Sequence, residues 1–279
     1  MKIRIVLADT DEKYINHFIR AFKIYYFNEV DIVTFSDSTA LKKYISSRAY
    51  DILLSIASLL PEEAEGKSMI LTSEMGIKEM NGRPAICKYQ KIENLYKGIL
   101  DTIAEQKSGI TYSYETSKES PVIAFTSAAG GVGKTTAALV YTRQLVKKGF
   151  QVMYLSLESF SNIDYFLNAE GSSNFSNVLF AVKCGKGNLQ MKIESSLKQT
   201  YGGVYFFSKP MNPNEIDELD QSEWKEFLDA VRAMEKFHCI VIDLPCANED
   251  TAKKIMPLSD RVLFITDGSD TTTERTQTL

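Results

Sequence analysis

A glycine-rich stretch constrains the fold of this chain more than any other part of its sequence. Residues 127–136 read Ser-Ala-Ala-Gly-Gly-Val-Gly-Lys-Thr-Thr, and they follow the apolar run Val122–Phe125 and lead into a helical pattern. A strand, a glycine-rich turn and a helix start with Lys-Thr at the junction form the context of a phosphate-binding loop. The amides of such a turn and the positive end of the helix together attract an anion. We therefore expect a strand–loop–helix unit that holds phosphate.

The loop predicts both a phosphate site and a metal ligand. We expect the Lys134 side chain to contact the β- and γ-phosphates of ATP, and the Thr135 hydroxyl to ligate Mg²⁺. The expected cofactor-binding residues are those of the motif itself: Gly130, Gly131, Val132, Gly133, Lys134, Thr135 and Thr136. The alternative is a turn that only joins a strand to a helix, and the intact motif with its correct flanks argues against that alternative.

An apolar run that ends in an acid is the expected partner of this loop. Cys239–Ile242 is followed by Asp243, so the carboxylate lies at the carboxyl end of a predicted buried strand. Buried strands often end in an acid that only caps a loop, but an upstream phosphate loop favours a metal role. Lys134 and Asp243 are therefore predicted catalytic residues, and Asp243 is predicted to hold Mg²⁺ with Thr135, through water.

Strand and helix patterns alternate through the first part of the chain. Because such alternation gives a parallel sheet, residues 1–106 are expected to form a flavodoxin-like, doubly wound α/β domain of about five strands. Strands are predicted at 3–8, 30–35, 51–56, 69–72 and 85–87, and helices after the cap Asp11 through Phe22, at 38–46 and at 92–105. Residues 107–120 are polar and have no sustained period, which predicts a linker.

Residues 121–279 are expected to form a second doubly wound domain, a P-loop fold with a mainly parallel sheet. Strands are predicted at 122–125, 151–158, 203–208, 239–243 and 261–266, and helices at 136–148, 161–167, 175–183 and 214–236. The last of these is one long helix whose apolar residues recur at helical spacing, which is typical of a core-facing helix.

Composition excludes several classes of protein. The net charge of −4 gives no basic field, so we expect no clear nucleic-acid binding. No run of about 18 apolar residues exists, so no membrane-spanning helix is predicted. The four cysteines have neither metal-ligand nor redox spacing, which predicts buried, reduced thiols in a cytoplasmic protein.

Acids follow the first predicted strand of this domain, a hydroxyl follows the fourth and a lysine follows the fifth, and this pattern resembles a response-regulator receiver domain. Asp9 and Asp11 follow the first strand, near the acidic metal-binding position of that family. Thr72 and Lys88 match its hydroxyl and its lysine after the fourth and fifth strands. The third strand offers only Ser55–Ala57 where the phospho-accepting aspartate should lie, and aspartyl phosphorylation needs a carboxylate nucleophile. We interpret the domain as a pseudo-receiver used for protein contacts; a live phospho-switch and a plain flavodoxin-like fold are the alternatives.

The phosphate loop, taken with Asp243-Leu244-Pro245, resembles the deviant-Walker ATPases that include MinD and ParA. A receiver-like domain fused to such an ATPase is similar to the TadZ/CpaE family, and this resemblance covers nearly the whole chain. It implies ATP and Mg²⁺ as cofactors, and a cytoplasmic homodimer that helps localise or assemble a Tad (type IVb) pilus secretion machine. It also implies other pilus-assembly or secretion components as partners, peripheral membrane association through them, and a position at the cell pole or the inner face of the membrane.

The sequence departs from that family at positions that bear on hydrolysis. Ala129 stands where MinD-like proteins have a lysine that reaches the partner subunit's phosphates, and Ala247 replaces an expected glycine. Ser156 and Glu158 correspond to paired aspartates of the family. Glu158 is therefore the first candidate for the group that orients the attacking water. Asp164 is a weaker candidate, with an acid on a helix surface as the alternative.

Two classes of function follow from these departures. One is a slow ATPase whose turnover drives a monomer–dimer cycle, and the other is a scaffold that binds ATP–Mg²⁺ with little turnover, which the departures favour. A ParA-like partitioning ATPase that binds DNA, and a regulator whose receiver domain controls an ATPase output, are further alternatives. Family members continue beyond the last strand, whereas this chain ends at Leu279, so we expect a truncated C-terminus or a partly open adenine pocket.

Overall fold

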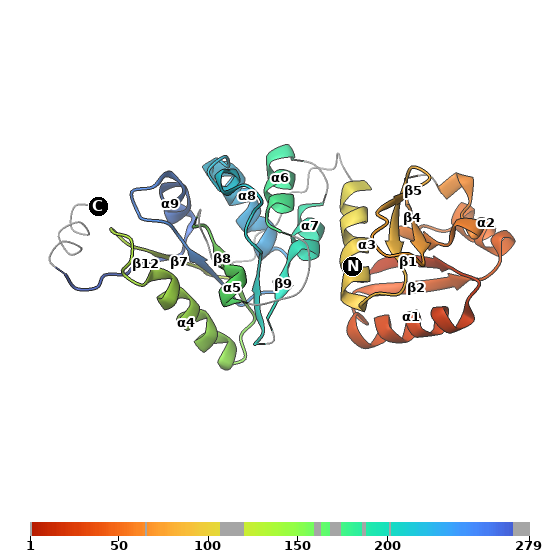
Figure 1. Ribbon diagram of the computed structural model, residues 1–279, viewed down its shortest axis with the longest axis horizontal. Coiled ribbons are helices and arrows are strands. Elements are labelled where there is room, and N and C mark those ends of the chain that lie inside the picture. Colours follow the sequence, from red (N-terminus) through yellow and green to blue (C-terminus); the bar gives the residue numbers. More distant parts are fainter. Residues whose placement is uncertain are drawn as a thin grey trace. The chain divides into compact units, whose positions relative to one another are not determined.

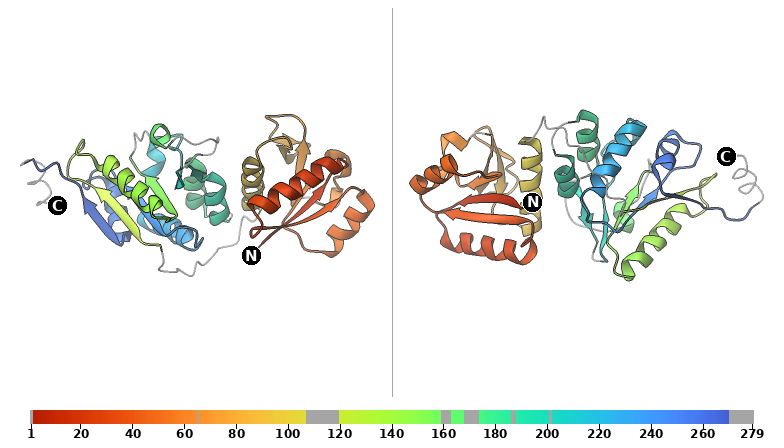
Figure 2. Two further views of the ribbon diagram at one scale, coloured as in Figure 1. Left: turned by 90° about the horizontal axis from the view of Figure 1, so that it is seen from below. Right: turned by 180° about the vertical axis from the view of Figure 1, so that it is seen from behind.

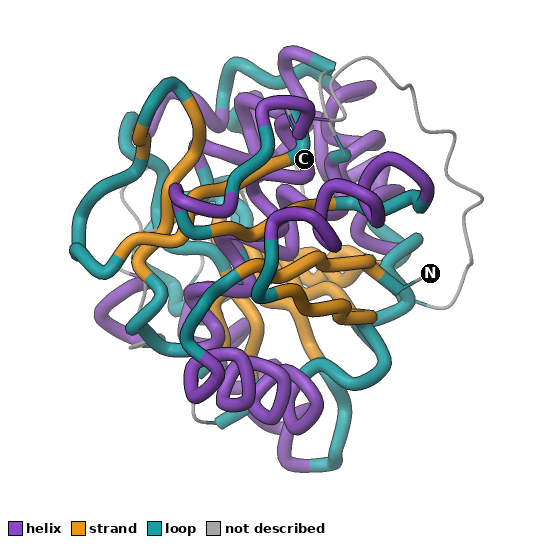
Figure 3. Tube along the Cα trace, turned by 90° about the vertical axis from the view of Figure 1, so that its right-hand side faces the viewer, coloured by secondary structure: helices purple, strands orange, loops and turns teal. Residues whose placement is uncertain are grey.

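Two compact units, residues 1–108 and 109–279, make up the structure, a computed structural model. It describes residues 2–64, 66–106, 120–158, 163–167, 174–185, 188–200 and 202–269. Each unit has helices packed around its own largely parallel sheet, as predicted (Figure 1, Figure 3). Most of the predicted linker at 107–120 lies outside the described residues, so its limits stay a prediction.

Six strands within the described residues of the first unit form a sheet in the order β2-β1-β3-β4-β6-β5. Their bounds are Ile3–Ala8 (β1), Val30–Phe35 (β2), Ile52–Ser55 (β3), Ser68–Thr72 (β4), Glu79–Met80 (β5) and Arg83–Cys87 (β6). With β6 as the fifth parallel strand, this is the flavodoxin-like order. The prediction of five strands missed β5, which pairs antiparallel with β6, because two residues carry no alternation to detect.

Helices cover both faces of this sheet (Figure 2). They are α1 (Glu12–Tyr25), α2 (Ser38–Ser47) and α3 (Ile92–Gln106), with short 3₁₀ turns η1 (Ala57–Leu59) and η2 (Glu62–Ala64). Leu41 of α2 packs with Val6 and Leu53 on one face. The alternate β1 residues Ile5 and Leu7, which point to the opposite face, are fully buried too. Burial on both sides explains why these strands read as nearly continuous apolar runs.

The second unit has a sheet in the order β12-β7-β11-β8-β10-β9. The bounds are Val122–Thr126 (β7), Val152–Ser156 (β8), Lys198–Gln199 (β9), Val204–Phe206 (β10), Cys239–Asp243 (β11) and Arg261–Phe264 (β12). The strands pair in parallel except β9, which pairs antiparallel with β10 and was not predicted. The parallel order places the carboxyl ends of β7, β11 and β8 side by side at one edge.

Helices of the second unit fall into two layers. Their bounds are Lys134–Lys147 (α4), Ile163–Phe166 (α5), Ser176–Cys184 (α6), Leu189–Ser196 (α7), Gln221–Arg232 (α8) and Asp250–Ile255 (α9), with 3₁₀ turns Pro213–Ile216 (η3) and Met256–Leu258 (η4). Ala138 and Leu139 of α4 pack with Tyr154 and Val241 on one face of the sheet. Residues of α6, α7, α8 and α9 form the larger core on the other face, around the fully buried Trp224. No described helix of either unit combines the length and hydropathy needed to span a bilayer.

The predicted long helix at 214–236 was wrong, because the structure divides it into η3 and α8. Asp220 begins α8 by accepting the amide of Glu223, and the Glu223 side chain accepts the amide of Asp220 in return. This reciprocal capping box is a strong helix start in the middle of the apolar pattern. The pattern continued through the break because the 3₁₀ turn also buries an apolar residue, Ile216.

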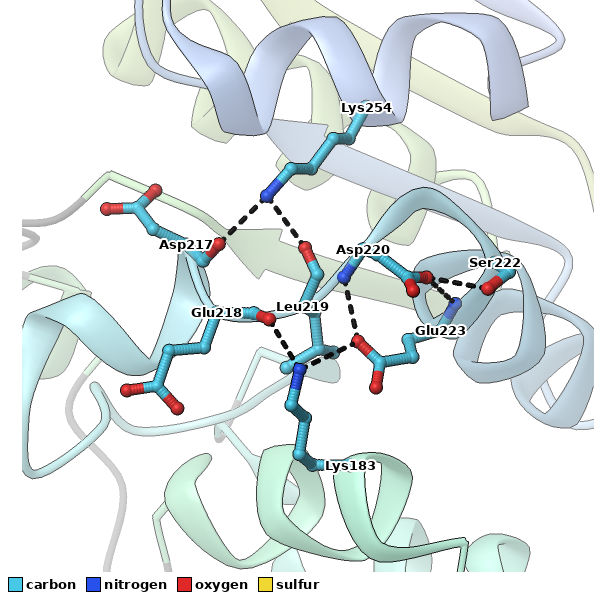
Figure 4. Close-up of polar contacts among 8 residues, drawn as sticks. All are labelled: Lys183, Asp217, Glu218, Leu219, Asp220, Ser222, Glu223 and Lys254. Carbon is cyan, nitrogen blue, oxygen red and sulfur yellow. Dashed lines mark hydrogen bonds and ion pairs between the residues drawn. The ribbon is translucent and has the colours of Figure 1, made fainter.

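Two lysines satisfy the carbonyl groups that the break leaves without helical partners (Figure 4). Lys254 of α9 donates to the carbonyl oxygens of Asp217 and Leu219, each at 2.8 Å. Lys183 of α6 donates to the carbonyl oxygen of Glu218 at 2.8 Å. Buried or half-buried carbonyl groups need such donors, so the corner before α8 is fixed by side chains from two other helices.

Candidate functional site

The glycine-rich loop joins β7 to α4 at the carboxyl edge of the second sheet. Gly131 and Gly133 have φ angles of 81° and 92°, in the left-handed region that favours glycine. Gly133 caps α4 without any side-chain hydrogen bond to the first turn. The first amides of the helix therefore lack an intrahelical acceptor, as an anion site at a helix start requires.

An open pocket of about 470 Å³ lies over this loop. It is lined by Gly130, Gly131, Gly133, Lys134, Thr135, Thr136, Glu158, Cys246 and Glu249. Six of the seven predicted cofactor-binding residues thus face one pocket, and Val132 does not line it. The volume lies within the range of ~300–1,000 Å³ that small-molecule sites occupy.

Lys134 is paired with a carboxylate that follows the end of β8, two strands away from β7 in the sheet. Its Nζ lies 2.7 Å from Oε1 of Glu158, which follows β8. The lysine side chain is 7% exposed and the glutamate 32% exposed. Burial works against the charged form of Lys134, but the hydrogen bond and charge of Glu158 raise the pKa of the ammonium. The glutamate thus pairs with the lysine of the glycine-rich motif and offsets its charge.

Asp243 lies beneath the loop and is fully buried. Its Oδ2 accepts hydrogen bonds from Thr135 Oγ1 at 2.7 Å and from Tyr154 Oη at 3.0 Å. Its Oδ1 is buried and has no hydrogen-bond partner among the described residues. Burial raises the pKa of Asp243 to about 6, although both hydroxyl donors act to lower it. Burial and the charge of Asp243 also raise the pKa of Tyr154, so its hydroxyl stays protonated and donates.

The donor set at Asp243 fits a hard divalent cation such as Mg²⁺. An orphaned carboxylate oxygen and a threonine hydroxyl within hydrogen-bond reach of the same carboxylate are oxygen ligands of the kind Mg²⁺ prefers. Within the described residues, no group of three or more His, Cys, Asp or Glu side chains offers an all-protein metal cage. A cation here would therefore share its coordination with phosphate and water, which is usual for Mg²⁺.

Asp164 and Glu158, the two candidates for a water-orienting acid, occupy different places. Asp164 is exposed on α5, and its Oδ2 accepts the amide of Lys209 at 3.3 Å. It does not line the pocket, whereas Glu158 does. The geometry therefore favours Glu158 over Asp164 as the acid nearest the phosphate site.

The positions that depart from the expected family pattern also have defined contacts. The amide of Ala247, a residue 2% exposed, donates to the carbonyl oxygen of Ser127 at 2.9 Å. The carbonyl oxygen of Ala129 accepts the Ser127 hydroxyl at 2.6 Å. Ser156 ends β8 directly beside Asp243 in the sheet register. Ser127 thus ties the loop to the segment after β11.

Sequence reasoning missed three residues at this site. Tyr154 reaches Asp243 from the middle of β8, while Cys246 and Glu249 line the pocket from the segment after β11. Glu249 Oε1 accepts the amide of Cys246 at 3.1 Å. A second acid soon after the strand-end aspartate was the available signal for Glu249. The prediction of buried thiols was correct for Cys87 and Cys239 and wrong for Cys184 and Cys246, which are half-buried.

The carboxyl edge of the first sheet, called here the receiver-like edge, brings two of its predicted residues, Lys88 and Asp9, into an ion pair. Lys88 Nζ lies 2.8 Å from Oδ2 of Asp9, and their side chains are 9% and 1% exposed. Burial opposes the charged form of Lys88, but the hydrogen bond and charge of Asp9 raise the pKa of the ammonium. The lysine also lies 4.8 Å from the ring centre of Tyr14 and 5.3 Å from that of Tyr89. The ion pair is therefore enclosed.

The remaining receiver-like positions make local contacts. Asp11 caps α1 by accepting the amides of Lys13 and Tyr14, which confirms its predicted role as a helix cap. Thr72 Oγ1 accepts the amide of Glu74 at 3.1 Å. Ser55 ends β3 fully buried, and its hydroxyl donates to the carbonyl oxygen of Ile56. The carboxyl end of β3 thus presents a hydroxyl engaged with the backbone in place of a carboxylate.

Solved structures with a similar fold include proteins of partitioning and cell-division systems. A ParA family ATPase from Chlorobium tepidum is 17% identical, with a TM-score of 0.48, over 58% of this chain and 66% of that one. MinD in the MinC:MinD complex of Aquifex aeolicus is 19% identical, with a TM-score of 0.47, over 56% and 60%. MinD from Pyrococcus horikoshii, complexed with Mg-ADP, is 19% identical, with a TM-score of 0.47, over 56% and 61%. The match thus spans less than two thirds of the length of each of these structures.

Family-level comparisons assign both units. A search of curated proteins found no match. Residues 1–104 match the family described as "TadZ-like, receiver domain", and residues 120–278 match the family described as "AAA domain". The second match covers more than half of the chain. With the phosphate loop and the receiver-like order of the first sheet, these matches confirm the predicted resemblance. The chain therefore belongs to the family described as "AAA domain" and carries a TadZ-like receiver domain ahead of it in the sequence.

Proposed function

We propose that this protein binds ATP with Mg²⁺ at the phosphate loop and turns it over slowly. The observation that carries the proposal is the arrangement of three residues. Lys134 and Thr135 of the loop line one pocket, and Thr135 donates a hydrogen bond to Asp243 at the end of β11. Gly130–Thr136 would hold the phosphates, with Lys134 as the cation. Thr135 and Asp243 would hold Mg²⁺, the latter through water. Bound Mg²⁺ would supply charge neutralisation at the phosphates.

Slow turnover is part of the proposal for two reasons. A cation that would speed phosphoryl transfer is missing, and the acid that would orient the attacking water forms an ion pair with Lys134. Ala129 provides no cation to reach across a dimer, and comparable arginine fingers are worth ~10³–10⁵ in rate. Glu158, the candidate for orienting water, pairs with Lys134 and must leave it when phosphate enters. Both features support a protein whose nucleotide state matters more than its rate of hydrolysis.

At the cellular level, we propose that the protein helps localise or assemble a Tad (type IVb) pilus secretion machine. The TadZ-like receiver domain supports this assignment. The buried Lys88–Asp9 pair and the absence of a carboxylate at Ser55 support a receiver-like domain used for protein contacts. We further propose a homodimer that meets other pilus components in the cytoplasm, at the cell pole or the inner face of the membrane.

The biochemical proposal is tested by measuring Mg-ATP binding and phosphate release with the purified protein. Wild type should bind Mg-ATP, and Lys134→Ala should lose at least about 100-fold in affinity, since a charge-assisted contact to phosphate disappears. Lys147→Ala, an exposed lysine at the end of the same helix, is the matched control. Equal binding by wild type and Lys134→Ala would refute the nucleotide site. ATP turnover near typical enzyme rates of ~1–10³ s⁻¹ would refute the proposal of slow hydrolysis but would leave the nucleotide site in place.

The cellular proposal needs a separate test. A fluorescent fusion of the full chain and the Lys134→Ala variant should be followed in cells that build a Tad pilus. We expect a polar focus that depends on pilus components and is reduced by the substitution. Co-localisation with the nucleoid instead, together with salt-dependent DNA binding in vitro, would favour the partitioning alternative.

A further inference from the structure

Tyr154 is a buried phenol that the phosphate-loop motif does not include. It lies in the middle of β8 and is fully buried. Its Oη donates to Oδ2 of Asp243 at 3.0 Å. A hydroxyl buried at this position needs a partner, and the partner that it has is the carboxylate assigned above to the metal.

The sheet register explains how the contact forms. In the parallel pairing of β8 and β11, Tyr154 lies opposite Val241, and Ser156 lies opposite Asp243. Because side chains alternate between faces, Tyr154 and Asp243 share the face that α4 covers. Neighbouring strands lie ~4.8 Å apart, so a long aromatic side chain can reach a residue two positions along the adjacent strand. The contact is therefore built into the sheet, and no loop has to move to make it.

Two hydroxyl groups hold the same oxygen of this carboxylate. Thr135 Oγ1 and Tyr154 Oη both donate to Oδ2, while Oδ1 has no hydrogen-bond partner among the described residues. Thr135 belongs to the phosphate loop and would be shared with the metal once nucleotide binds. Tyr154 belongs to the sheet, so its hydrogen bond does not depend on the ligand.

We propose that Tyr154 is a positioning residue for the metal–nucleotide site, whose hydroxyl fixes Oδ2 of Asp243 so that Oδ1 stays free to serve Mg²⁺. This inference rests on the proposed function, because it requires Asp243 to act on the metal. Tyr154 itself is not among the residues that line the pocket. It acts through the orientation of the carboxylate, as groups behind metal ligands generally do.

The proposal is tested by titrating ADP into the full chain with MgCl₂ and, separately, with EDTA. The measured quantity is Mg²⁺ coupling, the factor by which Mg²⁺ tightens ADP binding. Tyr154→Phe removes one oxygen and keeps the ring, so we expect coupling to fall about tenfold, as for one hydrogen bond to a charged group. ADP affinity in EDTA should not change. Tyr141→Phe is the control, since its ring packs on Phe125 of the same unit at 5.5 Å between centroids.

The possible outcomes separate this inference from the function on which it rests. Full coupling in Tyr154→Phe with lost coupling in Asp243→Asn overturns the inference and leaves the nucleotide site standing. Full coupling in Asp243→Asn overturns the metal role of Asp243 and with it the inference. An equal loss of ADP affinity with and without Mg²⁺ in Tyr154→Phe means a packing role, which also overturns it.

Folding of each variant is checked by the fluorescence of Trp224, the chain's one tryptophan, which is fully buried in the second unit. Should Tyr154→Phe fail this check, the same titration is made on Tyr154→Met. The unbranched methionine fills irregular space without a hydroxyl donor, so the same tenfold loss of coupling is expected and its absence is equally decisive.

Discussion

The two sheets of this protein each pair a lysine with a carboxylate at their carboxyl edge, and the two pairs differ in enclosure. Lys88 and Asp9 lie 2.8 Å apart with side chains 9% and 1% exposed. Lys134 and Glu158 lie 2.7 Å apart, but Glu158 is 32% exposed and faces an open pocket. The carboxylate of the first pair is part of the interior, whereas that of the second lies at a pocket that an anion from solvent could enter. Two ion pairs of similar length thus differ in how far solvent reaches the carboxylate.

The largest expected effect separates the two pairs by stability. Lys88→Ala leaves Asp9 buried without its cation and should lower the free energy of unfolding of the first unit by about 3–5 kcal/mol. Lys134→Ala leaves a carboxylate that solvent reaches, so the second unit should lose about 1 kcal/mol or less. Hydrogen exchange of each unit during denaturant titration measures both values. Equal losses in the two units would contradict the distinction between an enclosed and an open pair.

The next effect concerns Asp243, a buried carboxylate held by hydroxyl groups without a paired lysine. Burial raises the pKa of Asp243 to about 6 in the folded state, above its usual value of 3.8. The folded state then binds the proton more tightly, so this group's contribution to stability is greatest below pH ~4 and is lost as the pH rises to ~6. The difference in unfolding free energy between wild type and Asp243→Asn should change by about 3 kcal/mol over that window in metal-free buffer. A difference that does not vary with pH would show that the carboxyl group is hydrated in solution.

A smaller effect tests whether Glu158 competes with phosphate. Glu158→Gln removes the charge that neutralises Lys134, so Mg-ADP should bind up to about tenfold more tightly, a change of ~1.4 kcal/mol. Turnover should fall if Glu158 also orients water, which separates binding from hydrolysis. Asp164→Asn is the matched control, because Asp164 is exposed and contacts the amide of Lys209 away from the pocket. Tighter binding in both variants would mean that net charge alone is responsible.

The smallest expected effect is at the receiver-like edge. Incubation with acetyl phosphate and MgCl₂ should add no phosphate to the first unit, since Ser55 ends β3 with its hydroxyl bonded to a backbone carbonyl. Intact-mass measurement gives the result, with an active receiver domain as the positive control. A phosphorylated peptide from residues 1–106 would restore the phospho-switch alternative and make the Lys88–Asp9 pair part of a working site.

Most strands and helices of the fold could be predicted from local sequence patterns. The strands that became β1, β2 and β11 were predicted at their observed bounds, because each is a short run of mostly apolar residues. The phosphate loop could also be predicted from the sequence, since its residues are contiguous and form a single glycine-rich turn. The break before α8 was not, because a 3₁₀ turn and a helix in succession both bury apolar side chains and imitate one helix.

The residues of the site could be predicted from the sequence more easily than the contacts between them. Lys134 and Asp243 were singled out by motif, but the pairing of Lys134 with Glu158 depends on where two strands end in space. Tyr154 carried no signal at all, since a tyrosine within a buried strand is ordinarily a core residue. Its contact with Asp243 follows from the register of two strands that are distant in sequence, which no local spacing encodes.

The short helix α9 connects the wall of the pocket to the corner before α8. Its six residues span ~9 Å. One end follows Glu249 at the pocket wall, and Lys254 near the other end grips two carbonyl oxygens of that corner. These contacts hold the far end of α9 in place, so Glu249 and the corner before α8 are connected through a single short helix. The residues that anchor the far end of this helix thus lie outside the lining of the pocket.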